Sequence, residues 1–425
     1  MKKRILNKVV TSVLCITLAV ITVLSCVSCS SAVLPAKAIE ADELSAGYFR
    51  MTNASGTVSD DFKSEITDLS MTLFRKLVTN DKEYDLVSPI SAILCLAMLA
   101  NGADGNTKKQ IEDVLGMDVD TLNEYMYAYT SSLYSSDNCS VNIANSIWFR
   151  NNDNKLQISE DFLQANADWY DAQIYSAPFN SSTVNDINNW CKEQTDGMID
   201  NIIDRIDADM VMYLINAIAF DAKWAYEYKS EDIKNGTFTC YDGTPKKVTM
   251  LSSIENVYIS DDGVTGFVKD YKDGKYSFIA LLPDKGTDIF DFVDTLDGDR
   301  WNSLLEKREN VFVDVKMPEF SYSAKMNLNE VLKDMGMTDM FTDNADFTKL
   351  GSYEGENLSC SQIDQKTYIS VDSNGTKAAA VSWAISGCSG AIADEYVSLN
   401  RPFVYAIIDN ASGIPLFVGV VTYLG

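Results

Sequence analysis

The most informative segment of this chain reads Gly375-Thr376-Lys377-Ala378-Ala379-Ala380-Val381-Ser382. In an extended strand, alternate side chains point to opposite faces. One face of this segment and its continuation carries only small side chains, namely Thr376, Ala378, Ala380, Ser382, Ala384, Ser386 and Cys388. The other face carries the bulkier Lys377, Val381, Trp383 and Ile385. Such a strand could enter an existing sheet without clashing with its close-packed neighbours.

A short Ala-rich helix is the competing interpretation, because Ala is the best helix former. Three features disfavour it: Gly375 before the segment, the stretch Ser386-Gly387-Cys388-Ser389-Gly390 after it, and the β-branched residues within it. We therefore interpret the segment as an extended strand with one face of small side chains.

Helical and strand patterns both occur along the rest of the chain. Ile66, Leu69, Leu73 and Leu77 recur at helical spacing, and a capping box at Thr107–Gln110 predicts a helix that ends at Gly116. Predicted strands include an alternating run from Val311 to Met317 that Pro318 ends, and the segments Tyr276–Leu282, Phe403–Ile408 and Leu416–Val421. The last two are joined by a turn over Asp409–Gly413. With no repeat and no composition boundary past residue 60, we expect one large α+β domain over residues 61–425.

Composition excludes several classes of function. The chain has 35 basic and 61 acidic residues, a net charge of −26 and no histidine. So acidic a surface repels nucleic acid and anionic membranes. The lack of histidine excludes a Ser-His-Asp or Cys-His enzyme and a His-based zinc site. We therefore expect no nucleic-acid partner, no metal and no cofactor.

The N-terminus predicts export. A basic stretch, Met1–Arg4, precedes an apolar run from Val9 to Leu24, which is short for a membrane span and typical of a signal peptide. Val23-Leu24-Ser25-Cys26 resembles a bacterial lipobox, so we expect a signal peptide over residues 1–25 and lipidation at Cys26. Cys29 and cleavage after Ala38, at an A-x-A site, are the alternatives. Residues 26–60 lack periodicity and predict a flexible tether. The protein would then be extracellular, either lipid-anchored or, if cleaved after Ala38, secreted.

Six cysteines lie beyond this tether, and none of them is spaced as a metal ligand pair. We expect most of them to be small buried apolar residues. An even number permits disulfides, but the sequence assigns no pairing.

From about residue 62 to its end, the chain resembles the serpins. The segments that carry the resemblance, in order, are Ser88–Ser91 with Leu96–Ala103, Ala144–Trp148, Leu214–Phe220 with Trp224, Met317–Phe320, Met335–Met337, Gly375–Ser382 and Asn400–Ile407. The resemblance implies a large central β-sheet, further sheets, surrounding helices and an exposed reactive loop. It also implies a hinge at Gly375, Thr376, Ala378, Ala379 and Ala380, and a sheet-opening region that includes Ser88, Ser91, Asn216 and Trp224.

The function implied by the resemblance is suicide inhibition of a serine protease. The protease would cut the loop, form a covalent acyl complex and be distorted as the loop enters the sheet. The family's usual spacing from the hinge glycine, here Gly375, implies a reactive bond at Ser389–Gly390, and counting back from Pro402 gives Ala391–Ile392. Because the loop offers small residues and no Lys or Arg there, elastase-like or subtilisin-like targets are expected.

The chain also departs from the family pattern. Asp372-Ser373-Asn374 stands where acidic residues are usual, Lys377 replaces a common glutamate, and Gln365 stands where many relatives have a histidine that latches the sheet. Two other functions are possible: a non-inhibitory serpin-fold protein that binds or adheres at the cell surface, or an unrelated extracellular binding lipoprotein. An SDS-resistant complex with a protease distinguishes inhibition from both.

Overall fold

A computed structural model describes residues 39–50, 58–79, 84–133, 136–151, 155–207, 210–354, 357–376 and 393–424. Within these residues the fold is α+β, as predicted. It is built on two seven-stranded sheets, a four-stranded sheet and a two-stranded pair of β15 (Gly351–Tyr353) with β4 (Leu156–Ile158).

The central sheet has the strand order β1-β5-β3-β6-β17-β16-β14. Its strands are β1 (Asp42–Glu43), β5 (Gln173–Ala177), β3 (Cys139–Arg150), β6 (Met212–Lys223), β17 (Gly375–Thr376), β16 (Gln362–Val371) and β14 (Phe320–Asn327). Strand β6 is buried along almost its whole length. This explains why Leu214–Phe220 reads as a nearly continuous apolar run and not as an alternating one, since both faces of the strand are covered.

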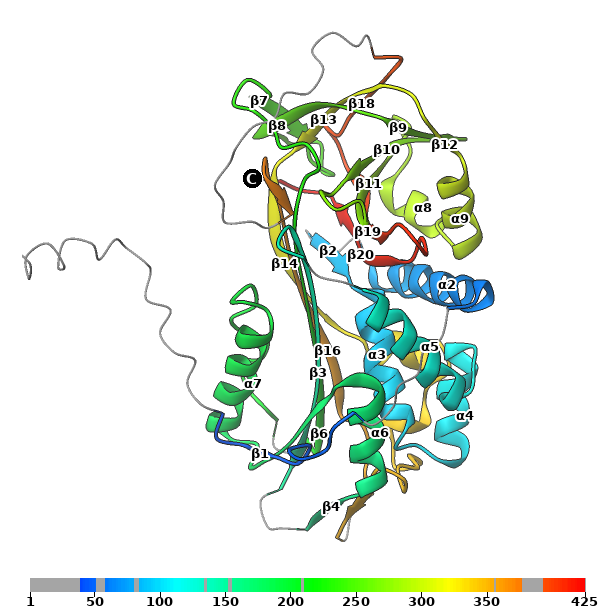
Figure 1. The fold of residues 1–425 in the computed structure, drawn as a ribbon, viewed down its shortest axis with the longest axis vertical. Coiled ribbons are helices and arrows are strands. Elements are labelled where there is room, and N and C mark those ends of the chain that lie inside the picture. The colour runs from blue at the N-terminus through cyan, green and yellow to red at the C-terminus, as the bar shows by residue number, and fades with distance from the viewer. Residues whose placement is uncertain are drawn as a thin grey trace, which may run out of the picture. The chain divides into compact units, whose positions relative to one another are not determined.

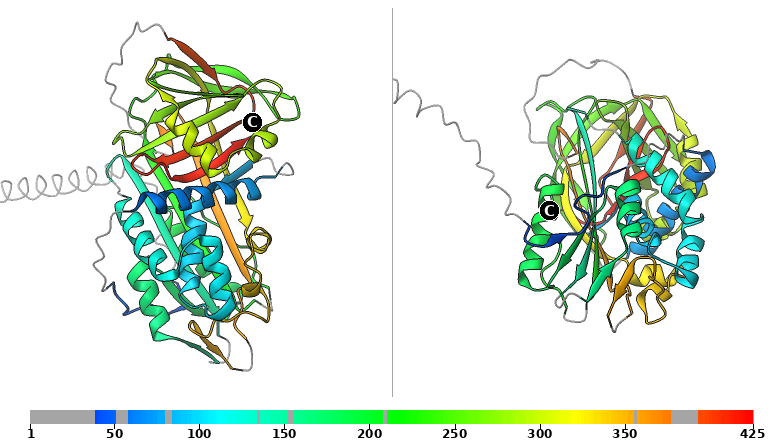
Figure 2. Two further views of the ribbon diagram at one scale, coloured as in Figure 1. Left: turned by 90° about the vertical axis from the view of Figure 1, so that its right-hand side faces the viewer. Right: turned by 60° about the horizontal axis from the view of Figure 1, so that its bottom comes forward.

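Helices cover both faces of this sheet (Figure 1). On one face lie α3 (Pro89–Ala100), α4 (Gly105–Leu115), α5 (Val119–Ser132) and α6 (Glu160–Tyr170), and α7 (Ser181–Gln194) covers the other face. Every residue of α3 is buried, and Pro89 stands at its start, where the missing N–H has no helical partner to lose. Helix α2 (Asp60–Leu77) runs crosswise between this helix layer and the second sheet (Figure 2, left).

The second sheet has the order β12-β9-β10-β11-β19-β20-β2 and the third has the order β18-β13-β8-β7. Their strands are β12 (Arg308–Glu309), β9 (Val257–Asp261), β10 (Val264–Asp270), β11 (Tyr276–Pro283), β19 (Phe403–Asp409), β20 (Pro415–Val421), β2 (Tyr84–Val87), β18 (Glu395–Ser398), β13 (Val313–Pro318), β8 (Pro245–Glu255) and β7 (Ile233–Thr239). The remaining helices are α8 (Ile289–Asp294), α9 (Gly298–Glu306), α10 (Asn329–Asp334) and a 3-10 turn at Asp339–Phe341.

The predicted elements are found close to their expected bounds, with one correction. Ile66, Leu69, Leu73 and Leu77 are all buried on α2, and Gly116 ends α4 in the left-handed conformation. The capping box at Thr107 is wrong, because α4 begins at Gly105 with Asp104 as its N-cap. Thr107 is buried, and its hydroxyl accepts a hydrogen bond from the backbone N–H of Asp346 instead.

Part of the segment predicted as a tether is in contact with the central sheet. Strand β1 pairs in antiparallel register with β5, with Asp42 opposite Ser176 and Glu43 opposite Tyr175. In the described part of the chain, no helix combines the length and the apolar character needed to cross a membrane. Cys26, Cys29 and Ala38 lie outside the described residues.

Candidate functional site

The central sheet is partly open between β6 and β16. These strands pair directly in parallel only where Gln362–Lys366 face Tyr213–Ala217. Farther along, β17 lies between them and is antiparallel to both, with Thr376 opposite Ala222 on one side and Val371 on the other. Between the two regions, the described strands show no pairing of β6 residues 218–221 with β16 residues 367–370. The insertable segment predicted from the sequence therefore begins inside the sheet.

The two regions share one register. Gln362 of β16 is paired with Tyr213 of β6 where the two strands are neighbours. Where β17 separates them, Val371 of β16 and Ala222 of β6 lie on either side of Thr376. In both places the residue number on β16 exceeds that on β6 by 149. Lengthening β17 would therefore require β6 and β16 to separate sideways but not to slide along each other. A slip by one residue would reverse the faces of a whole strand, so a shared register removes a large barrier to insertion.

Residues at the start of the hinge are tightly held. A Cβ atom on Gly375 would lie only 2.0 Å from the carbonyl oxygen of Ala222, so this close approach requires glycine. Thr376 is buried, and its hydroxyl lies 2.5 Å from the hydroxyl of Tyr271. Trp224 stacks on Tyr271 with ring centroids 4.7 Å apart.

Trp224 also binds the turn that precedes β17. Its indole N–H donates to the carbonyl of Asp372 at 2.9 Å, and its backbone N–H donates to the carbonyl of Asn374 at 3.0 Å. The carboxylate of Glu319 accepts a hydrogen bond from the backbone N–H of Ser373 at 3.2 Å. The Asp372 carboxylate also accepts hydrogen bonds from the backbone N–H groups of Asn374 at 2.7 Å and Gly375 at 3.2 Å. The turn is thus fixed by backbone contacts together with the two carboxylates of Asp372 and Glu319.

A buried ion pair supports Trp224. Lys269 Nζ lies 2.7 Å from Glu255 Oε1, and both side chains are at most 9% exposed. The same ammonium lies 5.2 Å from the ring centroid of Trp224 and 4.5 Å from that of Tyr228. Burial alone would lower the pKa of Lys269, but the adjacent Glu255 carboxylate and Tyr228 outweigh it and raise that pKa. Lys269 therefore remains charged between the two rings at neutral pH.

Sequence reasoning missed this pair. The sequence indicates only one member of the pair. Lys269 shares a strand face with Phe267, which is completely buried, and a charge on a buried face needs a partner. Its partner stands on a different strand, β8, and no spacing rule connects the two.

The predicted sheet-opening residues fall into two groups. Gln365 on β16 bridges the start of α3: its side-chain oxygen accepts from the Ser88 N–H at 2.9 Å, and its amide N–H donates to the Ser88 carbonyl at 2.8 Å. Asn216 lies beside Gln365 in the register and donates to Asn145. Ser91 follows one turn after Ser88 on α3. Trp224 stands apart from these residues, at the end of β6 where β17 enters.

Three polar atoms in the first group are buried with no hydrogen-bond partner among the described residues. They are Ser88 Oγ, Ser91 Oγ and Asn216 Oδ1. An unsatisfied buried polar group costs about 1–3 kcal/mol, so the partly open sheet carries an energetic penalty at this point.

The remaining predicted residues lie outside the described residues. These are the hinge residues Ala378, Ala379 and Ala380, and the reactive-bond candidates Ser389, Gly390, Ala391 and Ile392. Their position is bounded by β17, which ends at Thr376, and β18, which begins at Glu395.

The described cysteines are buried and unpaired, namely Cys95, Cys139, Cys191, Cys240 and Cys360. Burial raises the pKa of the Cys95, Cys139 and Cys191 thiols to about 12. These three remain neutral at neutral pH and are poor nucleophiles. No group of His, Cys, Asp and Glu in the described part of the chain could hold a metal ion.

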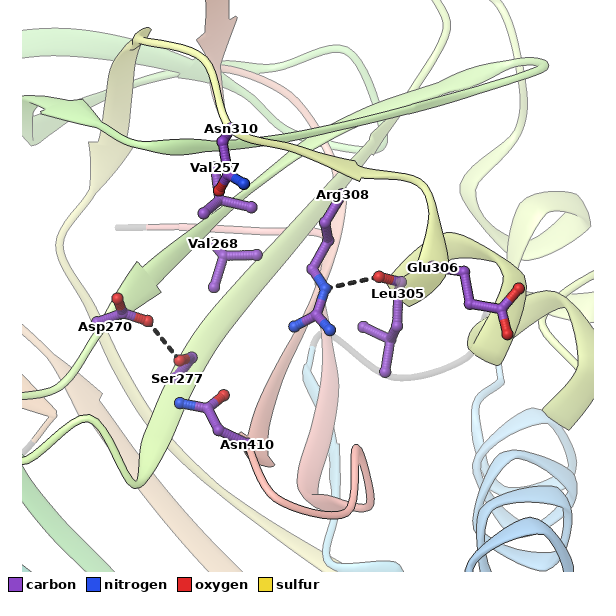
Figure 3. A pocket seen from close by; sticks show the side chains of 9 residues that line it. All are labelled: Val257, Val268, Asp270, Ser277, Leu305, Glu306, Arg308, Asn310 and Asn410. Atoms are coloured by element: carbon purple, nitrogen blue, oxygen red, sulfur yellow. Dashed lines mark hydrogen bonds between the residues drawn. The ribbon is translucent and has the colours of Figure 1, made fainter. Parts of the chain in front are cut away.

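A separate cavity of about 470 Å³ lies between α9 and strands of the second sheet (Figure 3). Two of its polar side chains donate hydrogen bonds to groups in its wall: Ser277 donates to Asp270 and Arg308 donates to the Leu305 carbonyl, each at 2.6 Å. No residue of β6, β16 or β17 lines it. The cavity is therefore not part of the opening in the central sheet.

Comparisons with known proteins agree on one family. Residues 64–424 match the family model described as "Serpin (serine protease inhibitor)". The chain is 30% identical to human glia-derived nexin, over 79% of this chain and 86% of the relative. It is 29% identical to leukocyte elastase inhibitor of Xenopus tropicalis, over 85% of this chain and 98% of the relative.

One solved relative, the thermophilic protein tengpin, is known in two states. Its native state superposes with a TM-score of 0.87 at 42% identity, covering 90% of this chain and all of that one. Its latent state gives a TM-score of 0.78 at 41% identity, covering 87% of this chain and all of that one. The described fold is therefore more similar to the native state than to the latent state.

Proposed function

The chain belongs to the serpins, a family of serine protease inhibitors, and we propose that it traps its target by inserting the cleaved reactive loop between β6 and β16. The observation that carries the proposal is β17, because the hinge already starts between these strands in the register that insertion needs. The protein would act without a cofactor.

The chemistry would come from the protease. Its catalytic serine would attack the carbonyl carbon at the reactive bond, first choice Ser389–Gly390, and form an ester to Ser389. Gly390 would leave with a free amino group. The loop, still joined to β16 through residues 372–375, would then enter the sheet and carry the attached protease with it. Water normally hydrolyses such an ester, and insertion would have to distort the protease before that step.

Extending the register of Thr376 explains why one loop face is small. Each further pair of residues would bring Ala378, Ala380 and Ser382 opposite Phe220, Ile218 and Asn216 in turn. Phe220 and Ile218 belong to the main core, and the Phe220 ring packs on Tyr271 and on Tyr276 and Phe417 of the second sheet. Close packing leaves room only for small side chains on that face. The bulkier Lys377, Val381 and Trp383 would face the α7 side.

The same register gives Ser382 a particular role. It would arrive between Asn216 on β6 and Gln365 on β16, close to the buried atom Asn216 Oδ1 that has no partner among the described residues. A hydroxyl group can donate a hydrogen bond to such an oxygen. Insertion would then relieve part of the penalty that the partly open sheet carries.

The target class follows from the loop sequence. Residues 378–400 contain no Lys or Arg, so a trypsin-like pocket with a buried acid would find no partner there. We predict SDS-resistant complexes with elastase-like or subtilisin-like proteases, and mass spectrometry of the released peptide should place the cut between Gly387 and Ile392. The 29% identity to a leukocyte elastase inhibitor supports this class. A stable complex with trypsin, and none with elastase or subtilisin, would contradict the assignment. Failure with all three would favour the non-inhibitory alternative.

The localisation is a separate proposal. The basic N-terminus, the apolar run and Cys26 support export and a lipid anchor. Mass spectrometry of the native N-terminus should find a lipid-modified Cys26. An unmodified N-terminus at Ile39 would show ordinary signal cleavage and a secreted protein.

A further inference from the structure

Three exposed apolar side chains gather on the outer face of the third sheet. Ile254 on β8 is 44% exposed, Phe312 just before β13 is 45% exposed, and Tyr396 on β18 is 55% exposed. Asp314 on β13 is the cross-strand neighbour of Ile254 on one side and of Tyr396 on the other. Phe312 precedes Asp314 by two residues and therefore lies on the same face of the sheet. Strands lie about 4.8 Å apart, so these four residues form one surface about 10 Å wide, here called the outer-sheet patch.

The patch has a defined charge as well as an apolar centre. Asp314 lies in its middle, and Asp394 borders it, with its carboxylate accepting the backbone N–H of Phe312 at 3.4 Å. Lys316 Nζ lies 5.5 Å from the ring centroid of Tyr396 and restrains that ring. Exposed apolar residues grouped in this way, and Tyr and Phe in particular, are typical of interaction surfaces. A complementary partner would present apolar side chains with basic groups around them.

The patch lies close in sequence to the end of the predicted reactive loop. Tyr396 is four residues beyond Ile392, the last residue of the predicted reactive stretch, and four residues span at most about 14 Å. A protease domain of roughly 230 residues has a radius of gyration of about 17 Å, so one that holds the reactive bond would lie against the end of this sheet.

We propose that the outer-sheet patch is a second docking surface for the target protease, contacted by an apolar and basic face of the protease while the loop occupies its active site. This inference rests on the proposed inhibitory function. Its effect is on the encounter complex, whose dissociation competes with cleavage of the loop. Contacts that slow dissociation raise the second-order rate constant of inhibition. They leave the fraction of protease trapped unchanged, because that fraction is decided later, by insertion.

The test compares a patch variant with a matched control. The patch variant is Ile254→Ser, Phe312→Ser, Tyr396→Ser, and the control is Phe49→Ser, which removes an even more exposed ring, 74% exposed, beside α6. Inhibition is followed with two elastase-like proteases, one with a basic and one with an acidic isoelectric point. With the basic protease, the patch variant should lose about tenfold in the second-order rate constant, as expected for a cluster of interface hot spots. Stoichiometry and melting temperature should not change, and the control should match wild type.

A charge variant tests the electrostatic part. Asp314→Asn with Asp394→Asn should flatten the salt dependence of the rate constant with the basic protease, since screening acts on the charges that it removes. Equal rate constants for wild type and the patch variant would overturn the inference while leaving inhibition intact. A wild type that traps neither protease would instead overturn the proposed function. Sedimentation could also detect a dimer of the wild type that the patch variant does not form. That result would show that the patch binds a second copy, and it would overturn the inference.

Discussion

Replacing Thr376 with Arg should convert the protein from an inhibitor into a substrate. Thr376 is 1% exposed and lies between β6 and β16, with its hydroxyl on Tyr271. An Arg there would have to bury an unpaired charge, which costs several kcal/mol. The protease would still cut the loop, because the reactive bond is about a dozen residues away. Slow insertion would then let water complete the hydrolysis of the ester.

The measurement is the fraction of elastase-like or subtilisin-like protease that becomes SDS-resistant per molecule of inhibitor cleaved. Wild type should trap most of the protease, and Thr376→Arg should be cleaved completely while trapping almost none. Thr376→Ser is the matched control, since it keeps a hydroxyl that can reach Tyr271, and it should behave as wild type. An Arg variant that traps protease as well as the Ser variant would show that insertion does not pass through this position.

Removing Lys269 alone should destabilise the intact protein strongly. Lys269→Met leaves Glu255 buried without its cation, and breaking a buried pair in this way costs about 3–5 kcal/mol. It also removes the cation that lies between the rings of Trp224 and Tyr228. Because Trp224 binds the turn before β17, the hinge should loosen as well.

The double variant Lys269→Met, Glu255→Met distinguishes this explanation from simple loss of packing. Apolar replacement of both partners removes the uncompensated charge, so the double variant should recover most of the stability lost in each single variant. The midpoint of urea unfolding measures the effect. Lys109→Met breaks an exposed ion pair with Asp113 and should change that midpoint little. If the double variant were destabilised by the sum of the two single losses, the ion pair would not be the cause of either loss.

Much of the fold could be predicted from local pattern. The helical spacing of Ile66 to Leu77 and the alternation of Val313, Val315 and Met317 reflect one buried face each, and local periodicity reports that directly. The small alternate face after Gly375 predicts an insertable strand, of which the described residues include only the start, Gly375–Thr376 in β17. These features depend on residues close together in the sequence.

The parts that could not be predicted depend on contacts between distant segments. Thr107 fits a capping box locally, but the backbone of Asp346 uses its hydroxyl. The Lys269–Glu255 pair joins two strands of different sheets. Gln365 could be expected to donate and accept hydrogen bonds, yet only the fold brings the backbone of Ser88 to it. The exposure of Ile254 and Tyr396 likewise depends on which face of the third sheet is covered.

The most direct test of insertion is the melting temperature before and after a single cut in the loop by a protease that is not trapped. A strand from residue 376 onward would pair on both sides and form about a dozen backbone hydrogen bonds, each contributing about 1 kcal/mol net. At about 2 °C per kcal/mol for a large domain, the cleaved protein should melt at least about 20 °C higher than the intact protein. Equal melting temperatures for the intact and cleaved forms would show that the cleaved loop does not join β6 and β16.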